Sequence, residues 1–239
     1  MINLRSVIYQ MLFHLWTVAL SIVSLPSLVL PASVIWYISR IWSVTNFAIL
    51  RWVVGLGYRI EGQENIATEP VIYASKHQSA WDTMIFPVII KKPVIVLKKE
   101  LQWIPLYGWY LHKYGCISVD RNAGASALRS MVQGARNAIS DGRSIVVFPE
   151  GTRTAPGERG SYQSGVAALY RELAIPVVPV ALNSGLFWRR RSYQRKPGTI
   201  VLRLLPAIQP GLDRKEFMTR LETKIEAAQV QLTDKSAQN

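Results

Sequence analysis

The sequence predicts an α/β fold: a mixed, twisted sheet with flanking helices, preceded by a hydrophobic helical segment at the N-terminus. The chain has 239 residues, which is enough for one α/β domain with a substantial core. After Arg59, short apolar runs alternate with longer segments of helical periodicity, as they do in βα units. Before that point, no aspartate, glutamate, lysine or arginine occurs between Ser6 and Ser39.

The uncharged segment from Val7 to Ile38 is longer than the roughly 7–15 apolar residues of a signal peptide. It is shorter than the roughly 40 residues that two full membrane spans need, and Pro26 and Pro31 interrupt it. Two forms therefore fit: one tilted span followed by a short interfacial helix, or a helical hairpin that dips into one leaflet. A pair of buried helices in a soluble core is a third form, but so long an uncharged stretch is rare there. We expect residues 1–58 to anchor the chain in a membrane.

The main domain is expected to span residues 59–232, followed by a disordered tail over residues 233–239. Short apolar runs predict strands at Val71–Ala74, Val94–Leu97, Cys116–Val119, Ile145–Phe148, Val177–Ala181 and Thr199–Leu205. Longer periodic segments predict helices at Trp81–Ile90, Ala123–Ser140, Ser164–Leu173 and Arg214–Gln231. The last helix carries an apolar stripe at Phe217, Leu221 and Ile225, which are spaced by four residues and predict a buried face.

A formal net charge of +13 indicates an anionic partner, either a nucleic acid or the surface of a membrane. The chain has no zinc-finger spacing, no RNA-recognition motif and no basic low-complexity tail, so nucleic-acid binding is not expected. One cysteine, Cys116, excludes an intrachain disulfide, and with only three histidines it is too little for a structural zinc site. The hydrophobic N-terminus makes a membrane the favoured partner.

The segment from Lys76 to Asp82 directly follows a predicted strand and has the strongest catalytic character. His77 and Asp82 are five residues apart, a spacing that separates their side chains on one continuous helix. They meet if His77 lies in the loop and Asp82 in the first turn of the next helix. A carboxylate on one ring nitrogen then leaves the other nitrogen free to accept a proton. Ser79-x-x-Asp82 is also a capping-box pattern, which needs no catalytic role.

Two further predicted strands end in charged residues. In the segment 148–153, Gly151 permits close approach of the backbone to a ligand or an oxyanion. Arg153 can bind a phosphate with two hydrogen bonds, and Glu150 can accept from hydroxyls or hold the arginine. Another strand is followed by Arg121, a possible second phosphate ligand. Taken singly, these segments fit an ordinary turn or a solvated strand end equally well.

Several other catalytic patterns are absent from the sequence. It contains no G-x-S-x-G nucleophile elbow and no Walker A motif. Cys116 lies in an apolar strand, where a free cysteine usually behaves as an inert, small apolar residue. His14 and His112 have no evident carboxylate partner, so we expect both to be structural.

Taken together, these segments resemble the bacterial 1-acyl-sn-glycerol-3-phosphate acyltransferases of the glycerolipid acyltransferase family. The four sequence blocks of that family occur here in order, at His77–Asp82, Gly115–Arg121, Phe148–Arg153 and Ile175–Ala181. The run Lys98–Leu101 resembles a further Lys-x-Glu-Leu stretch of the family. The family often has asparagine before the histidine, where this chain has Lys76. Four blocks in a fixed order are far more specific than any one of them.

The resemblance implies a glycerolipid acyltransferase-like fold and a role for each matching residue. His77 would be the general base, Asp82 the group that orients it, and Lys98 a donor to the developing oxyanion. The residues implied to bind the glycerol phosphate are Arg121, Glu150, Gly151, Thr152 and Arg153. The resemblance implies no metal and no cofactor, because the acyl carrier is itself a substrate.

The function implied by the resemblance is transfer of a fatty acyl group from acyl-coenzyme A or acyl carrier protein to lysophosphatidic acid. The sn-2 hydroxyl would be acylated, which gives phosphatidic acid. Another lysolipid acceptor, such as a lyso-ornithine lipid, is the nearest alternative. A membrane-surface binding protein with an inactive site and a hydrolase of acyl thioesters are two others. The implied location is the bacterial inner membrane, with the catalytic domain on the cytoplasmic face.

Overall fold

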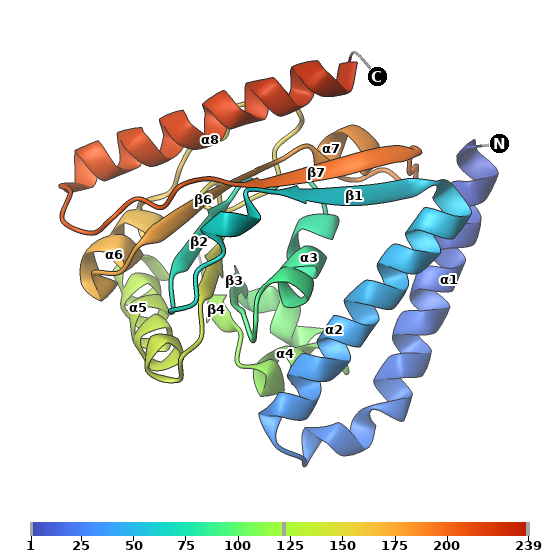
Figure 1. Cartoon of the computed structure of the whole chain (residues 1–239). Helices are drawn as coiled ribbons and strands as arrows, with labels where there is room; N and C mark the ends of the chain where they lie inside the picture. Colours follow the sequence, from blue (N-terminus) through green and yellow to red (C-terminus); the bar gives the residue numbers. More distant parts are fainter. Residues whose placement is uncertain (1, 121–122, 238–239) are drawn as a thin grey trace.

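The structure is a computed structural model that describes residues 2–120 and 123–237 (Figure 1). Its strands are β1 (Leu56–Glu61), β2 (Ile72–Ser75), β3 (Val94–Lys98), β4 (Ile117–Val119), β5 (Ile145–Val147), β6 (Val177–Leu182) and β7 (Gly198–Leu204). Its α-helices are α1 (Ile2–Val23), α2 (Ala32–Ile49), α3 (Trp81–Ile89), α4 (Tyr107–Tyr114), α5 (Gly124–Ser140), α6 (Ser164–Leu173), α7 (Ser184–Phe187) and α8 (Arg214–Ala237). Short 3₁₀ turns are η1 (Leu25–Leu28), η3 (Gln63–Asn65) and η4 (Lys99–Trp103), and η2 (Leu50–Val54) is a π-helical turn.

The strands of the described chain form one sheet in the order β1-β7-β6-β2-β5-β3-β4. The strands β6, β2, β5, β3 and β4 run parallel to one another, whereas β7 is antiparallel to β6 and parallel to β1. The sheet is therefore mixed, as the sequence predicts. The carboxyl ends of the parallel strands lie along one edge, which is where α/β proteins place their ligands.

Helices cover both faces of the sheet, because its central strands are apolar on both sides (Figure 1). One face carries Tyr73 and Val146 and packs against α3 and the N-terminal helices. The other face carries Ile72 and Ile145 and packs against α5, α6 and α8. The predicted apolar stripe of α8 is confirmed, because its three residues are fully buried against this second face.

The N-terminal segment forms a helical hairpin in which α1 and α2 lie side by side (Figure 1). The turn between them contains Pro26 and Pro31, and Trp16 Nε1 of α1 donates to Thr45 Oγ1 of α2 at 2.7 Å. By length and composition α1 could anchor in a membrane, and only 11% of its apolar window is buried. A core helix would be mostly buried, so the hairpin fits better than a helix pair in a soluble core.

Several features, among them the short helix α7, differ from the sequence-based prediction. The sequence does not predict β1, an edge strand in which only Leu56 is fully buried, so its apolar alternation is weak. It also does not predict the short α4, which tertiary contacts hold in place, including the 2.6 Å bond from Tyr110 Oη to Ser21 O. The sheet thus begins inside the segment 1–58 that was expected to anchor the chain. The backbone of α8 stays helical to Ala237, inside the tail expected to be disordered.

Candidate active site

Loops at the carboxyl edge of the parallel strands carry the residues that the sequence singles out. His77 follows β2, Glu150 follows β5, and Lys98 is the last residue of β3. Asp120 follows β4, and Ser184 begins α7 just after β6. Because parallel strands end at the same edge, segments far apart in the sequence come together there.

His77 and Asp82 form the contact that the sequence predicts. His77 lies in the loop and Asp82 in the first turn of α3, and the distance from Nδ1 to Oδ2 is 2.9 Å. The aspartate is fully buried, whereas the histidine side chain is 12% exposed, so a substrate can reach the ring. Since a carboxylate oxygen accepts, Nδ1 carries the proton in the neutral ring and Nε2 has a free lone pair. The imidazole also stacks on Phe148 at a centroid distance of 4.0 Å.

The Asp82 carboxylate is held by more donors than the histidine alone. Its Oδ2 accepts from the backbone N–H of Gln78 at 2.6 Å and of Ser79 at 2.8 Å. Its Oδ1 accepts from Ser79 Oγ at 3.0 Å and from Ser184 Oγ at 2.5 Å. The bond from the Ser79 N–H to Asp82 Oδ2 is half of a capping box, and Ser79 Oγ accepts from the Trp81 N–H at 3.1 Å. The capping pattern and the histidine contact therefore occur together and are not alternatives.

Ser184 is a site residue that sequence reasoning missed. It is fully buried and reaches Asp82 from the far side of the carboxylate. The one available indication was its position just after the strand of the fourth sequence block, at the same sheet edge as His77. Nothing in the local spacing indicates which carboxylate it would contact.

Glu150 is buried beside His77, and both of its carboxylate oxygens have partners within the protein. Oε2 accepts from the His77 N–H at 3.2 Å. Oε1 accepts from Thr154 Oγ1 at 3.0 Å and the Gly160 N–H at 3.2 Å, and it pairs with Lys76 Nζ at 2.7 Å. With these contacts made, the carboxylate fixes the loop instead of facing an open space. The sequence-based expectation was that Glu150 touches the glycerol phosphate. Its contacts indicate instead an indirect role, in which it holds the backbone of the loop.

The glycine of this loop serves the turn. Gly151 has a φ of +66°, a conformation that favours glycine, and its N–H donates to Phe148 O at 2.9 Å. That N–H is therefore not a free donor for an oxyanion, contrary to one expectation from the sequence. Thr152 is exposed and Arg153 half-buried. Within residues 2–120 and 123–237, no carboxylate pairs with the Arg153 guanidinium, which leaves it able to bind an anion.

The two remaining predicted site residues are less defined. Lys98 stands at the carboxyl edge, but its side chain is 49% exposed and its Nζ pairs with Glu100 Oε1 at 2.9 Å. The structure therefore does not place its ammonium in contact with His77 or Asp82. Arg121 lies outside the described residues. In the described ranges, no group of three or more histidine, cysteine, aspartate or glutamate side chains could hold a metal ion.

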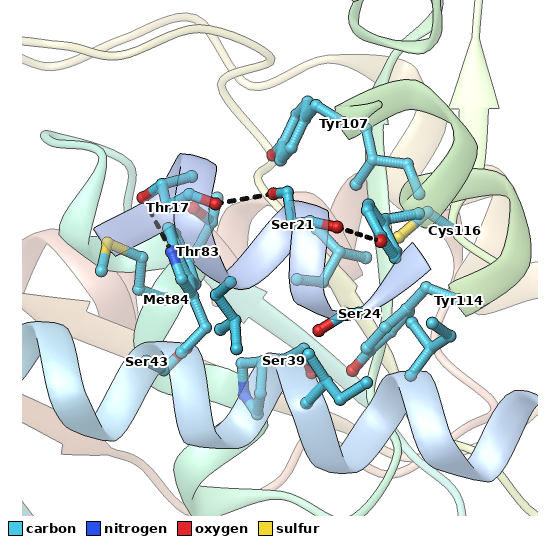
Figure 2. Close-up of a pocket in the computed structure, with 18 residues that line it drawn as sticks. Thr17, Ser21, Ser24, Ser39, Ser43, Thr83, Met84, Tyr107, Tyr114 and Cys116 are labelled. Carbon is cyan, nitrogen blue, oxygen red and sulfur yellow. Dashed lines mark hydrogen bonds between the residues drawn. The ribbon is translucent and has the colours of Figure 1, made fainter. Parts of the chain in front are cut away.

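An apolar cavity of about 160 Å³ lies between the hairpin, α3 and α4 (Figure 2). Thr83 and Met84, which follow Asp82 on α3, line it, so the cavity and the His77 site share this helix. Tyr107 of α4 lines it too. Tyr107 is 43% exposed as a whole residue, but burial around its hydroxyl raises the pKa of Tyr107 to about 12, while the nearby Arg153 guanidinium acts in the opposite direction. The cavity thus extends between the helix that carries Asp82 and the surroundings of Arg153.

Cys116 lines the same cavity, and burial raises the pKa of its thiol to about 12. The thiol is therefore neutral near pH 7, and a neutral thiol is a poor nucleophile. This agrees with the inert role expected from its apolar strand.

Comparison with known proteins gives matches in sequence and in fold. A family model described as Acyltransferase matches residues 57–183. A 1-acyl-sn-glycerol-3-phosphate acyltransferase of Pseudomonas aeruginosa is 31% identical over 80% of this chain and 74% of that protein. The protein of the same name from Cocos nucifera is 30% identical over 67% of this chain, which spans about half of its length (53%). The crystal structure of the 1-acyl-sn-glycerophosphate (LPA) acyltransferase of Thermotoga maritima superposes with a TM-score of 0.80 over 98% of both chains. Its sequence is 20% identical, so this match shows the shared fold.

Proposed function

Because this chain belongs to the acyltransferase family, we propose that it acylates the sn-2 hydroxyl of lysophosphatidic acid and forms phosphatidic acid. The acyl donor is a thioester, either of coenzyme A or of acyl carrier protein. The observation that carries the proposal is the 2.9 Å contact between His77 Nδ1 and Asp82 Oδ2. It supplies a base whose second nitrogen can take the proton of an alcohol.

In the proposed reaction, the acceptor hydroxyl attacks the thioester carbonyl carbon while His77 Nε2 takes its proton. The tetrahedral intermediate then expels the thiolate, the C–S bond breaks, and the proton passes from His77 to the thiolate sulfur. An ester and a free thiol result, and the imidazole returns to its starting state. Asp82 stabilises the imidazolium that forms in between, as its buried carboxylate stays next to Nδ1. A positioned base of this kind contributes about 10²–10⁴-fold to the rate.

The acceptor is proposed to bind through its phosphate. Arg153 lies at the same edge as His77 and no carboxylate of the described chain neutralises it, so it suits a phosphate monoester. Arg121 is proposed as a second phosphate ligand on the basis of its sequence block alone. Lys98 is proposed to stabilise the oxyanion, for which its ammonium would have to leave Glu100.

The apolar parts of the substrates are proposed to enter from a membrane. The hairpin presents apolar residues outward, with Val29 88% and Val23 76% exposed near its turn. The cavity between the hairpin and α3 is proposed to receive an acyl chain, because it is apolar and is lined by the helix that carries Asp82. We place the protein at the inner membrane of a bacterium, with the catalytic domain on the cytoplasmic face, where both thioester donors are made.

The test is an acyl-transfer assay with lysophosphatidic acid as the acceptor. The donor is radiolabelled palmitoyl-coenzyme A or radiolabelled palmitoyl-acyl carrier protein. Labelled phosphatidic acid should form with the wild type and not with His77→Ala. His112→Ala is the matched control, because His112 is exposed on α4 and should leave the product unchanged.

The rival functions give different products in the same assay. Transfer to a lyso-ornithine lipid in preference to lysophosphatidic acid would replace the proposed acceptor. Labelled free fatty acid without an ester product would indicate a thioester hydrolase. Absence of any His77-dependent turnover would indicate a binding protein with an inactive site.

A further inference from the structure

A buried lysine, Lys76, lies directly before the proposed base. The Lys76 side chain has no exposed surface. Its ammonium contacts Glu150 Oε1 at 2.7 Å, Glu226 Oε1 at 2.7 Å and the Glu158 backbone oxygen at 3.2 Å. The ammonium thus donates two hydrogen bonds, to Glu226 and to the Glu158 backbone, and forms an ion pair with Glu150.

The contacts of Lys76 join three parts of the chain. Glu150 belongs to the loop after β5, and Glu226 belongs to α8, 150 positions away from Lys76 in the sequence. Glu226 is 6% exposed, and its Oε1 also accepts from Tyr162 Oη at 3.1 Å. The C-terminal helix is thereby bonded to the segment that carries the base.

Electrostatics explains why these groups depend on one another. Moving an ammonium or a carboxylate out of water costs several kcal/mol, and opposite charges in contact offset that cost. Without Lys76, Glu150 and Glu226 would be two buried carboxylates facing each other, and one of them would have to take up a proton. Buried ion pairs seldom add net stability over apolar side chains of similar size, but they do require a defined geometry.

That geometry continues to the proposed base. Glu150 uses Oε1 for Lys76 and Oε2 for the His77 N–H at 3.2 Å, so one carboxylate connects the ammonium to the His77 backbone. The Thr154 N–H closes the arrangement by donating to His77 O at 2.9 Å. A continuous series of hydrogen bonds and one ion pair, between Lys76 and Glu150, therefore runs from α8 to both sides of the residue that carries the imidazole.

We propose that Lys76 is a positioning residue that holds the His77 loop and the Glu150–Arg153 loop in register through Glu226 of α8. The inference rests on the proposed function for its effect on turnover. Its effect on the backbone of the His77 loop does not depend on that function. Loss of the link should lower kcat more than it changes KM, because small displacements of a positioned base are costly to the rate.

The main variant is Glu226→Gln, which keeps the shape of the side chain and removes its charge. The matched control is Glu61→Gln. Glu61 lies on the edge strand β1 and forms a partly buried ion pair with Arg203 of β7 at 2.8 Å, which the substitution weakens. We expect Glu226→Gln to lower kcat roughly tenfold, with the KM of each substrate within about twofold of the wild type. Glu61→Gln should leave both constants within about twofold.

Lys76→Met tests the ammonium itself, and a second change keeps the test valid if this variant folds poorly. The double variant Lys76→Met with Glu226→Gln removes the ammonium together with one of the two carboxylates. It should therefore melt at a higher temperature than Lys76→Met alone and recover part of its lost kcat. Two independent, additive losses would overturn the proposal.

Hydrogen–deuterium exchange gives a measurement that needs no activity. The amides of residues 76–82 should exchange faster in Glu226→Gln than in the wild type and remain unchanged in Glu61→Gln. Unchanged exchange in both variants would refute the link between α8 and the His77 loop. A wild type that shows the expected exchange but no acyl transfer would count against the proposed function alone.

Discussion

The His77 site and the apolar cavity under the hairpin share helix α3 and are built in opposite ways. At the His77 site, the Asp82 carboxylate accepts five hydrogen bonds, and Glu150 has partners on both oxygens. The cavity is lined mainly by apolar side chains from α1, α2, α3 and α4. One of its six serine and threonine hydroxyls, that of Ser43, is buried with no hydrogen-bond partner among the described residues.

We therefore expect the two regions to control different properties: the His77 site controls the rate, and the cavity controls which acyl chain is used. Hydrogen bonds depend on direction and distance, so a change at the His77 site should alter catalysis for every substrate. Apolar contacts depend mainly on the area and volume available, so a change in the cavity should alter which chain fits. Four predictions test this separation, from the largest expected effect to the smallest.

The largest effect is expected at Asp82. In Asp82→Asn the side chain loses its charge, and an amide N–H can replace an oxygen toward His77 Nδ1, which favours the wrong tautomer. We expect kcat to fall by about 10²–10⁴-fold for thioesters of 12, 16 and 18 carbons alike. Asp141→Asn, an exposed change at the end of α5, is the control. A loss confined to one chain length would contradict the separation.

A smaller effect is expected at Arg153. Arg153→Ala removes a charged donor for the acceptor phosphate, and hydrogen bonds to charged groups contribute about 1.5–3 kcal/mol. We therefore expect kcat/KM for lysophosphatidic acid to fall about 10- to 100-fold, with the KM of the thioester unchanged. Arg159→Ala changes an exposed arginine nearby and should have little effect. An equal loss of kcat/KM with an acceptor that lacks a phosphate monoester would show that Arg153 does not act through the acceptor phosphate.

The third prediction concerns the cavity wall. Ser43→Leu adds apolar volume where the hydroxyl has no partner, so the cavity becomes smaller. The enzyme should then prefer a shorter acyl chain. Each methylene that no longer fits costs about 0.8 kcal/mol, which lowers the relative kcat/KM of the longer thioester about fourfold. Competition between labelled 14- and 18-carbon thioesters measures this ratio. Ser43→Ala should keep the wild-type ratio, and a uniform fall in rate for Ser43→Leu would count against the cavity as the chain site.

The smallest effect is expected at Cys116, which lines the cavity but takes no part in the proposed chemistry. Cys116→Ala should keep kcat within about twofold. Because burial raises the pKa of the thiol to about 12, the fraction of thiolate should rise about tenfold for each pH unit between 7 and 10. Labelling of the folded protein by iodoacetamide, followed by mass spectrometry, should show that increase. Rapid labelling at pH 7 would mean that the thiol is exposed or activated.

The sequence allowed prediction of the features that short spacings determine. The loop position of His77 and the first-turn position of Asp82 follow from a strand, a five-residue gap and a helix start, and the contact is present. The buried stripe of α8 follows from its helical spacing in the same way. Alternation of apolar and periodic segments likewise predicted the mixed α/β class, because each pattern is local. The edge strand β1 was missed because one buried residue in six gives little alternation.

The chain by itself thus determined the reactive pair, the class of fold and the apolar N-terminus, since each depends on neighbours a few residues apart. Only the tertiary structure decided that Ser184 reaches Asp82 across 102 positions, that Lys76 lies between two glutamates, and that four helices enclose a cavity. Those contacts depend on the order of strands in the sheet and on the packing of the hairpin. A pattern of apolar and polar residues along the chain specifies which faces are buried, but not which distant side chains meet there.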